Sequence, residues 1–485
     1  MKKSLLIMGL LGLAAHARAQ TSTPGLGPWV RVNTTNVASF APGYFVVDVK
    51  TVSPTVSWSV AEENSQAGIP NRYYRTNNAA GTEFDFGAIS AANGAANFQT
   101  GNISSVGNLV AVAATYPVTG AGGEILRTTN GGQSWTKVST ASQFVAGQNG
   151  FCNFVHMFDA SVGVSLGDPT NGYFEILRTT DGGLTWTRIP QSSIPAPLPD
   201  EFGLTRSFFA LGNTIWAGLG SSVATNPVRV LKSTDRGLTW TVSALTPLLE
   251  GINRLAFKDD QNGIAYNTKL NAAKTAVAAV NVIRTADGGA TWTAITPVNT
   301  PTGSFFRFDI DAVTGHYYSV GRRFPEPTPR AAEDFGSSTS TDGVNWKNLN
   351  VGQGFFAFDV IPGSSATNVV GYAGAATDSL GVGGLYKGNV TLAATRDAAL
   401  QRTLSAYPNP SHAGVFRVEL GTYLKAGARL TVVDALGRQV LSQNLSVTAI
   451  GSKAVNLDLS TEKAGVYTLQ IRTEAGIATQ KLVID

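Results

Sequence analysis

The stretch that decides the fold is RTTDGGLTWTRI, residues 178–189, a polar turn followed by a tryptophan on the next strand. Four related stretches occur elsewhere: RTTNGGQSWTKV at 127–138, KSTDRGLTWTVS at 232–243, RTADGGATWTAI at 284–295, and SSTSTDGVNWKNL ending at Leu349. Their hydroxyl-bearing starting residues lie 51 to 55 positions apart, at Thr128, Thr179, Ser233, Thr285 and Ser340. A repeat of about this period predicts a chain built from similar four-stranded sheets.

Each repeat has the chemistry of a tight turn between two strands. An Asp or Asn side chain can accept backbone N–H groups inside the turn, and the glycines allow positive φ. The tryptophan brings a large apolar face to the returning strand. We therefore expect a structural role for the turn residues Asn130, Asp181, Asp235, Asp287 and Asp342, and for the tryptophans Trp135, Trp186, Trp240, Trp292 and Trp346.

The shared pattern, Ser/Thr-x-Asp-x-Gly-x-Thr-Trp, resembles the Asp-box, also called the BNR repeat. The resemblance implies a β-propeller whose boxes join the third and fourth strands of each blade, away from the central channel. Two copies depart from the pattern, because Asn130 replaces the aspartate and the Ser340 copy is one residue shorter. A degenerate copy, RTNNAAGTEF, begins at Arg75.

The length of the repeat region predicts a seven-bladed propeller over residues 20–390. Six copies account for six blades, and the segment after Phe355 has three strand-like runs but no box. Residues 28–33, PWVRVN, resemble the returning strands of the boxes. We therefore expect Trp29 to Val32 to supply the missing fourth strand and so remove an exposed sheet edge.

The composition of the chain agrees with this all-β interpretation. Only 14% of the 485 residues are charged, and there are 53 Gly, 23 Phe and 8 Trp. Disordered chains have few aromatic residues and a high net charge, so this composition excludes disorder. The single cysteine, Cys152, excludes an internal disulfide and a cysteine-rich zinc site. The formal net charge of +4 shows no bias toward nucleic acid.

The N-terminus reads as a secretory signal peptide over residues 1–19. Lys2 and Lys3 precede an apolar run of about eleven residues, and Ala17-Arg18-Ala19 is a small-x-small cleavage site. The run is too short to span a bilayer, and no later stretch is long enough, so we expect no stable membrane insertion. The mature chain is expected to begin at Gln20.

The C-terminus, residues 404–485, differs in kind from the repeats. It contains LSAYPNPSHAGVFRVEL, LTVVDALGRQVLSQNL and AGVYTLQIRTEAGIATQKLVID, whose alternating apolar runs predict a small Ig-like β-sandwich. These motifs resemble the type A sorting domain of type IX secretion. The resemblance implies a Bacteroidota-type export route to the cell surface or outside, with the secretion machinery as partner. Residues 391–403 read as a linker.

Functional residues are expected on the first strand of each blade, which lines the channel of a propeller. Arg206, Arg254 and Arg307 stand in three consecutive repeats, 9 or 10 residues before the next strand, and His156 lies on a nearby first strand. Three guanidiniums would suit a carboxylate, phosphate or sulfate, so these four residues form a candidate anion site. In the alternative interpretation the arginines pair with neighbouring acids and His156 belongs to the core.

No motif assigns a reaction. There is no GxxxxGK[ST], HExxH or GxSxG, so neither a metal nor a cofactor is expected and catalytic residues stay unassigned. Propellers with Asp-boxes resemble sialidases, xyloglucanase-type hydrolases and photosystem-II assembly factors, and the style of ILRTTDGGLTW is most similar to the last group. The sequence thus favours a non-enzymatic module that binds a glycan or a cell-surface protein. The alternative is a sialidase-like glycoside hydrolase acting on acidic or polymeric glycans.

Overall fold

The computed structural model divides the chain into two compact units, residues 1–391 and 392–485. It describes residues 29–32, 44–63, 71–76, 78, 80–81, 83–90, 98–273, 276–300, 302–313, 315–325, 331–363, 368–377, 383–391, 398–420, 428–434, 438–445, 453–473 and 476–485. The expected signal peptide, residues 1–19, lies outside these ranges. Within them, no helix has both the length and the apolar character needed to cross a membrane.

Successive four-stranded antiparallel sheets build most of the N-terminal unit, which is the arrangement of propeller blades. The first two are β6 (Phe98–Ser105), β7 (Ala111–Pro117), β8 (Glu124–Thr128) and β9 (Thr136–Lys137), then β10 (Cys152–Met157), β11 (Gly163–Thr170), β12 (Tyr173–Thr179) and β13 (Thr187–Arg188). The next two are β14 (Glu201–Leu211), β15 (Thr214–Ser221), β16 (Val230–Ser233) and β17 (Thr241–Val242), then β18 (Arg254–Phe257), β19 (Gly263–Leu270), β20 (Val277–Thr285) and β21 (Thr293–Ile295). Another contains β22 (Asp309–Val313), β23 (His316–Arg322), β24 (Phe335–Ser340) and β25 (Lys347–Val351).

The two ends of the repeat region meet in one larger sheet. It contains β2 (Tyr44–Ser53), β3 (Val56–Glu63), β4 (Arg72–Thr76) and β5 (Phe84–Ala88), together with β26 (Ala357–Pro362), β27 (Asn368–Thr377), β28 (Gly383–Thr391) and β1 (Trp29–Arg31). Strand β1 pairs antiparallel with β28, with Trp29 opposite Gly388. The structure therefore confirms that the segment at Trp29 supplies a strand beside the last three strands of the repeat region.

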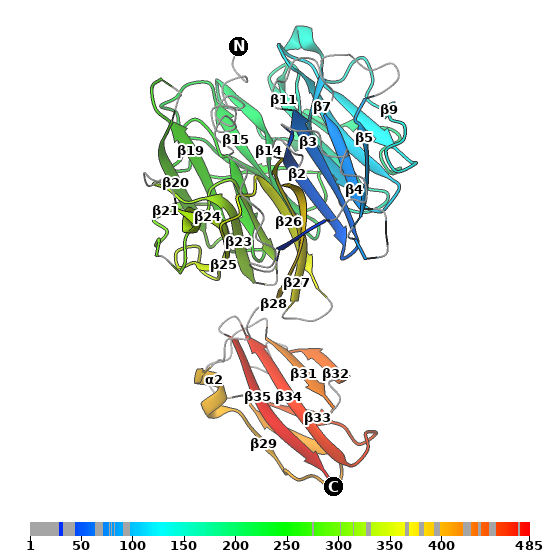
Figure 1. Ribbon diagram of the computed structural model, residues 1–485, viewed down its shortest axis with the longest axis vertical. Coiled ribbons are helices and arrows are strands. Elements are labelled where there is room, and N and C mark those ends of the chain that lie inside the picture. Colours follow the sequence, from blue (N-terminus) through cyan, green and yellow to red (C-terminus); the bar gives the residue numbers. More distant parts are fainter. Residues whose placement is uncertain are drawn as a thin grey trace. The chain divides into compact units, whose positions relative to one another are not determined.

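The first strands of these sheets contact one another in cyclic order. The neighbours are β2 and β6, β6 and β10, β10 and β14, β14 and β18, β18 and β22, β22 and β26, and β26 and β2. In the view of Figure 1, β2, β14 and β26 lie toward the middle of the N-terminal unit, whereas β5, β9, β20 and β21 lie toward its sides. Residues on the first strands are thus placed to form a central site.

The box at residues 178–189 joins the third strand of its sheet to the fourth, as the resemblance implied. Asp181 Oδ1 accepts hydrogen bonds from Thr179 Oγ1 at 2.7 Å and from the backbone N–H of Thr185 at 3.0 Å. Gly182 and Gly183 have φ of 73° and 81°. Burial acts to raise the pKa of Asp181. The hydrogen bonds from Thr185, Thr179 and Leu184 outweigh it, so the pKa falls to about 2.

The other boxes repeat this bond from the hydroxyl to the turn residue. The distances are 2.9 Å to Asn130, 2.8 Å to Asp235, 2.7 Å to Asp287 and 3.0 Å to Asp342. Asn130 therefore replaces the aspartate without loss of the turn bond. In the shorter copy, Ser340 Oγ accepts the backbone N–H of Gly343, three residues later. In the box at Thr179 the hydroxyl accepts the backbone N–H of Gly183, four residues later. The acids of the boxes serve the turns themselves.

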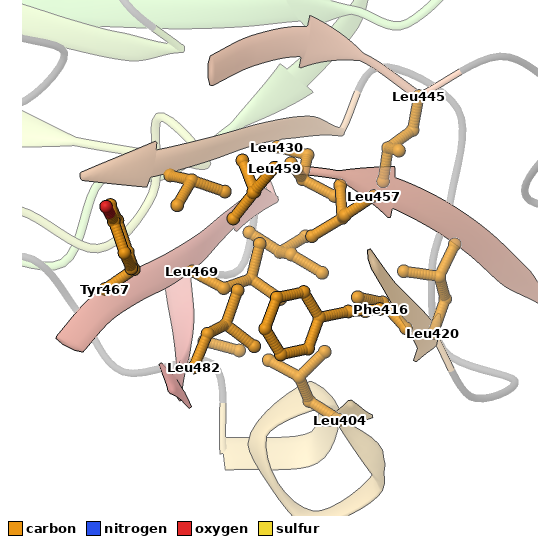
Figure 2. Packing of buried hydrophobic residues seen from close by; sticks show 14 of the residues in the cluster. Leu404, Phe416, Leu420, Leu430, Leu445, Leu457, Leu459, Tyr467, Leu469 and Leu482 are labelled. Atoms are coloured by element: carbon orange, nitrogen blue, oxygen red, sulfur yellow. The ribbon is translucent and has the colours of Figure 1, made fainter. Parts of the chain in front are cut away.

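The C-terminal unit has two small antiparallel sheets around an apolar core. One contains β29 (Ser405–Tyr407), β30 (Val415–Glu419) and β33 (Ala454–Asp458), and the other β31 (Arg429–Val433), β32 (Gln439–Asn444), β34 (Gly465–Thr473) and β35 (Gly476–Ile484). Figure 2 shows Phe416 surrounded by leucines from several strands. Part of the expected linker forms helix α2 (Ala398–Thr403), whose Leu400 is buried in this core.

Candidate functional site

Charged side chains gather on the first strands of the N-terminal unit. Side chains two residues apart on a strand point to the same face, so the pairs Asp48 and Lys50 on β2, and Asp309 and Asp311 on β22, each share a face. We use the name inner-strand cluster for Asp48, Lys50, Arg254, Asp309, Asp311 and Asp359. Its members are linked across sheets that are far apart in sequence.

Arg254, one of the three predicted arginines, is paired with an acid of the next sheet. Its Nε donates to Asp309 Oδ1 at 2.9 Å, and the two side chains are 18% and 14% exposed. Asp309 Oδ2 also accepts the backbone N–H of Phe358, at 3.1 Å. Burial raises the pKa of Asp309, although Arg254 acts to lower it. This geometry fits the interpretation in which the arginine neutralises a neighbouring acid.

A second group of charges joins the first and last sheets. Lys50 Nζ lies 3.2 Å from Asp359 Oδ1, and Asp359 Oδ2 accepts the backbone N–H of Thr51 at 2.5 Å. Asp311 accepts the backbone N–H of Val360 at 2.7 Å. Burial and the nearby carboxylate of Asp359 raise the pKa of Asp311 well above its ordinary value. These bonds connect β2, β22 and β26, so they hold strands at the two ends of the repeat region together.

Arg206 reaches from β14 to the sheet that contains β2 and β3. Its NH1 donates to the carbonyl of Val47 at 2.9 Å, and its NH2 lies 3.7 Å from Glu62 Oε1. The backbone of Arg206 has a φ of 59°, at a register shift in β14. A non-glycine residue pays about 1–2 kcal/mol for this conformation. The strain is sustained by the surrounding structure, and it directs the guanidinium away from its own sheet.

Asp48 is the neighbour that Arg206 and Arg254 share. Burial raises the pKa of Asp48 to about 7, against the backbone N–H of Ile103 and the charges of both arginines, which lower it. Ile103 donates to Asp48 Oδ2 at 2.8 Å. Two of the three predicted arginines therefore act on the pKa of the same carboxyl group, although their bonds are to other residues: Arg206 to Val47 and Arg254 to Asp309.

The third arginine, Arg307, precedes β22 and lies against aromatic and cationic side chains. Its guanidinium lies 5.2 Å from the centre of the Phe308 ring, and that of Arg322 lies 5.6 Å from the same centre. The backbone carbonyl of Arg307 accepts the hydroxyl of Tyr266 at 2.7 Å. Arg307 is only 3% exposed.

His156 lies among aromatic rings. Its imidazole is edge-on to Phe158 and Phe208, with centroid distances of 4.7 Å and 5.8 Å. Burial, together with the positive charges of Lys50 and Arg236, lowers the pKa of His156 to about 3. The side chain is therefore neutral at physiological pH. Within the described part of the chain, no group of three or more His, Cys, Asp or Glu is placed to hold a metal.

Asp48, Lys50 and Glu62 were not predicted as site residues. The stretch YFVVDVKTV does carry a signal, because two charged residues on one face interrupt an otherwise apolar strand. Glu62 has no comparable signal, since it lies next to the last residue of a strand in which polar and apolar residues are mixed.

Three of the basic residues that precede a box hydroxyl, Arg127, Arg178 and Lys232, have a role that the sequence did not reveal. Arg127 Nε donates to the carbonyl of Gly182 at 2.8 Å, and Arg178 Nε donates to that of Arg236 at 3.0 Å. Lys232 Nζ donates to the carbonyl of Gly288 at 2.8 Å. Each basic side chain therefore crosses to the box of the next sheet, which ties neighbouring sheets together.

The chain has distant relatives and structural neighbours. A xyloglucanase from a Paenibacillus species is 27% identical over an alignment of 241 residues. The match covers 44% of this chain and 20% of the relative, so the chain spans about a fifth of the relative's length. YCF48 from Cyanidioschyzon merolae has a TM-score of 0.45 at 14% identity, covering 74% of this chain and 98% of its own. PorZ, an essential surface component of the type IX secretion system of Porphyromonas gingivalis, has a TM-score of 0.39 at 12% identity, covering 89% and 58%.

The C-terminal unit has a family match. Residues 405–485 match the secretion system C-terminal sorting domain. The matched range begins with β29 and includes every strand of the unit's two sheets. The chain therefore carries a type IX sorting domain, which directs the protein to the cell surface or outside the cell.

Proposed function

We propose that residues 29–391 form a seven-bladed β-propeller that acts outside the cell as a non-enzymatic module binding a glycan or a protein. The cyclic contacts of β2, β6, β10, β14, β18, β22 and β26 support seven blades. The pairing of β1 with β28 supports closure of the ring, because it gives the last blade its fourth strand.

The single observation that carries the non-enzymatic interpretation is how the central charges are used. Arg254 pairs with Asp309, and Lys50 pairs with Asp359. The carboxylates of Asp309 and Asp359 also accept backbone N–H groups from neighbouring first strands. Side chains bonded in this way stabilise the ring, and a reaction that used them would have to break those bonds.

Export depends on the C-terminal unit. We propose that the type IX secretion machinery recognises residues 404–485, since the matched sorting domain covers nearly all of this range. The N-terminal unit would then be delivered to the surface as the functional part of the protein.

The test uses the chain from Gln20 onward, purified and applied to a glycan array and to a panel of outer-surface proteins. The same preparation is incubated with the bound glycans, and released sugars are measured. Binding without release supports the module. Failure to bind any glycan or protein would remove the proposal.

A glycoside hydrolase is the second candidate function, and the state of Asp48 favours it. A pKa of about 7 keeps this carboxyl largely protonated at mildly acidic pH, as a general acid of glycoside hydrolysis requires. Asp309 is near enough to raise the pKa of Asp48 further. Sugar release that is lost in Asp48→Asn would establish this function in place of the first.

The anion site at Arg206, Arg254, Arg307 and His156 stays a prediction. An anion at Arg254 would have to compete with the carboxylate of Asp309, which already accepts from its Nε. Arg254→Ala tests the site directly, because it should abolish binding of acidic glycans and leave binding of neutral glycans intact.

A further inference from the structure

The strand β35 forms one edge of its sheet, and residues from an earlier part of the unit cover that edge. The sheet has the order β32-β31-β34-β35, so β35 has a strand neighbour on one side only. In an antiparallel strand the backbone groups of alternate residues face opposite sides. Thr479, Lys481 and Val483 are three such alternate residues, and they bond away from β34, to side chains of residues 401–409.

Gln401, on helix α2, bonds to Thr479 as a residue of a neighbouring strand would. Its Nε2 donates to the carbonyl of Thr479 at 2.8 Å, and its Oε1 accepts the backbone N–H of Thr479 at 2.9 Å. Two opposite residues of an antiparallel sheet exchange the same two kinds of bond. One side-chain amide therefore takes the place of a strand at this position.

The loop after β29 continues the cover. Asn409 Nδ2 donates to the carbonyl of Lys481 at 2.6 Å, and its Oδ1 accepts the backbone N–H of Val483 at 2.9 Å. The backbone N–H of Ser411 donates to the carbonyl of Val483 at 2.9 Å, and its carbonyl accepts the backbone N–H of Asp485 at 3.3 Å. The cover thus continues past the end of the strand.

Buried neighbours hold these polar groups against the edge. We use the name edge clasp for Gln401, Asn409 and Ser411. Leu400 and Leu404, on either side of Gln401, are 1% and 6% exposed and belong to the apolar core of the unit (Figure 2). Ser411 is 1% exposed, whereas Asn409 is exposed. An exposed amide can bond to water instead, so the anchored residues beside it are what keep it on the strand.

An uncovered β35 would be a place for another strand to add. The strand has nine residues, and its sequence GIATQKLVI is rich in β-branched and apolar residues. A long, open edge of this kind pairs readily with another chain, and native proteins cover such edges or place lysine on them. The exposed Lys481 on this edge fits the same purpose. A second copy offers an identical strand, and two identical strands can pair antiparallel about a two-fold axis.

We propose that the edge clasp keeps the protein monomeric by occupying the edge through which β35 would pair with β35 of a second copy. Gln401 precedes the range 405–485 that matches the sorting domain, so the guarded unit extends back to α2. The clasp goes beyond the proposed function, because it acts in the C-terminal unit whatever the N-terminal unit binds.

The test combines Gln401→Met with Asn409→Ala in the chain from Gln20, which removes both amides of the edge clasp. Light scattering after size exclusion should find monomers in the wild type and dimers in the double variant as concentration rises. At low concentration, hydrogen exchange at the backbone amides of Thr479 and Val483 should be about tenfold or more faster in the variant, since each loses its acceptor. At high concentration the protection should return, because a second β35 supplies new acceptors.

Asn444→Ala is the matched control, since it removes an exposed amide from β32 at the other edge of the same sheet. It should leave the chain monomeric and β35 protected. A synthetic peptide of residues 476–485 supplies the second strand directly and should bind the double variant but not the wild type. If thermal unfolding shows that the double variant has lost its fold, Gln401→Met alone is given the peptide.

Three results would overturn the edge clasp. In the first, the amides of Thr479 and Val483 stay protected in a folded, monomeric variant, so the side-chain bonds do not guard the edge. In the second, protection is lost but the variant stays monomeric and does not bind the peptide, which leaves the edge to a partner other than a second copy. In the third, dimers form while β35 remains unprotected, so the chains pair elsewhere.

Discussion

Replacing Trp29 by alanine tests whether the N-terminal strand closes the N-terminal unit. Trp29 is 8% exposed, and its ring centroid lies 5.4 Å from that of Phe355. Its Nε1 donates to Ser337 Oγ at 2.9 Å. Strand β1 has only three residues, and Trp29 is its one buried apolar side chain, since Val30 is 69% exposed. Val32, directly after the strand, is also buried.

The expected loss can be worked out from the burial of the indole. Removing a buried tryptophan side chain costs about 3–5 kcal/mol, which includes the apolar area and the cavity left behind. The entropy of unfolding is roughly 2.1 cal/mol/K per residue, or about 0.76 kcal/mol/K for a unit of roughly 360 residues. A loss of about 4 kcal/mol therefore lowers Tm by about 5 °C.

The assay combines calorimetry with amide hydrogen exchange, and Trp240→Ala is its control. Trp240 is 6% exposed and its Nε1 donates to Gly237 within its own turn, so a similar loss of Tm is expected there. In Trp29→Ala, exchange should rise in β26, β27 and β28, because their outer edge is released. The closure argument is refuted if those strands keep their protection while Tm falls as it does in the control.

Three further outcomes are expected. The folded pKa of Asp48, about 7, exceeds the ordinary value of 3.8, so the unfolded chain releases this proton first. The free energy of unfolding should fall by on the order of a few kcal/mol as pH rises from about 4 to 7. Asp48→Asn, which keeps an acceptor for Ile103, should remove this dependence. Identical pH profiles of Tm for the wild type and Asp48→Asn would contradict the assignment. Asp181→Ala should lower the free energy of unfolding in urea by about 2 kcal/mol, because several bonds to a charged acceptor are lost. Asp181→Asn should lower it by under about 1 kcal/mol, since Asn130 makes the same turn bond in another box. Equal losses for the two variants would show that the turn bonds do not matter. Deleting residues 405–485 should leave the protein in the periplasm, which cell fractionation measures, and normal surface export of the truncated chain would rule out the sorting role.

The sequence was sufficient wherever structure depends on local chemistry. The box at Asp181 could be predicted because its turn bonds join residues within four positions of one another. The role of Trp29 could also be predicted, because its segment copies the pattern of the returning strands. The sorting domain was found in the same way, from motifs that recur along residues 404–485.

The candidate site could be predicted only in part. The positions of Arg206 and Arg254 on first strands were predicted from their register, and the structure places them on β14 and β18. Their partners could not be inferred, because Glu62 is 144 positions from Arg206 and Asp309 is 55 positions from Arg254. The register of Arg307 suggested a similar place, yet its guanidinium lies against Phe308.

The sequence by itself determined the repeated turn, the all-β class and the export signal, since each follows from the spacing of residues close together in the chain. Only the tertiary structure decided which charges meet at the centre. Closing a ring of sheets brings together first strands that are distant in sequence, and the direction of a long side chain there depends on the whole ring. The positive φ of Arg206 is the clearest case, because that backbone conformation directs its side chain to another sheet.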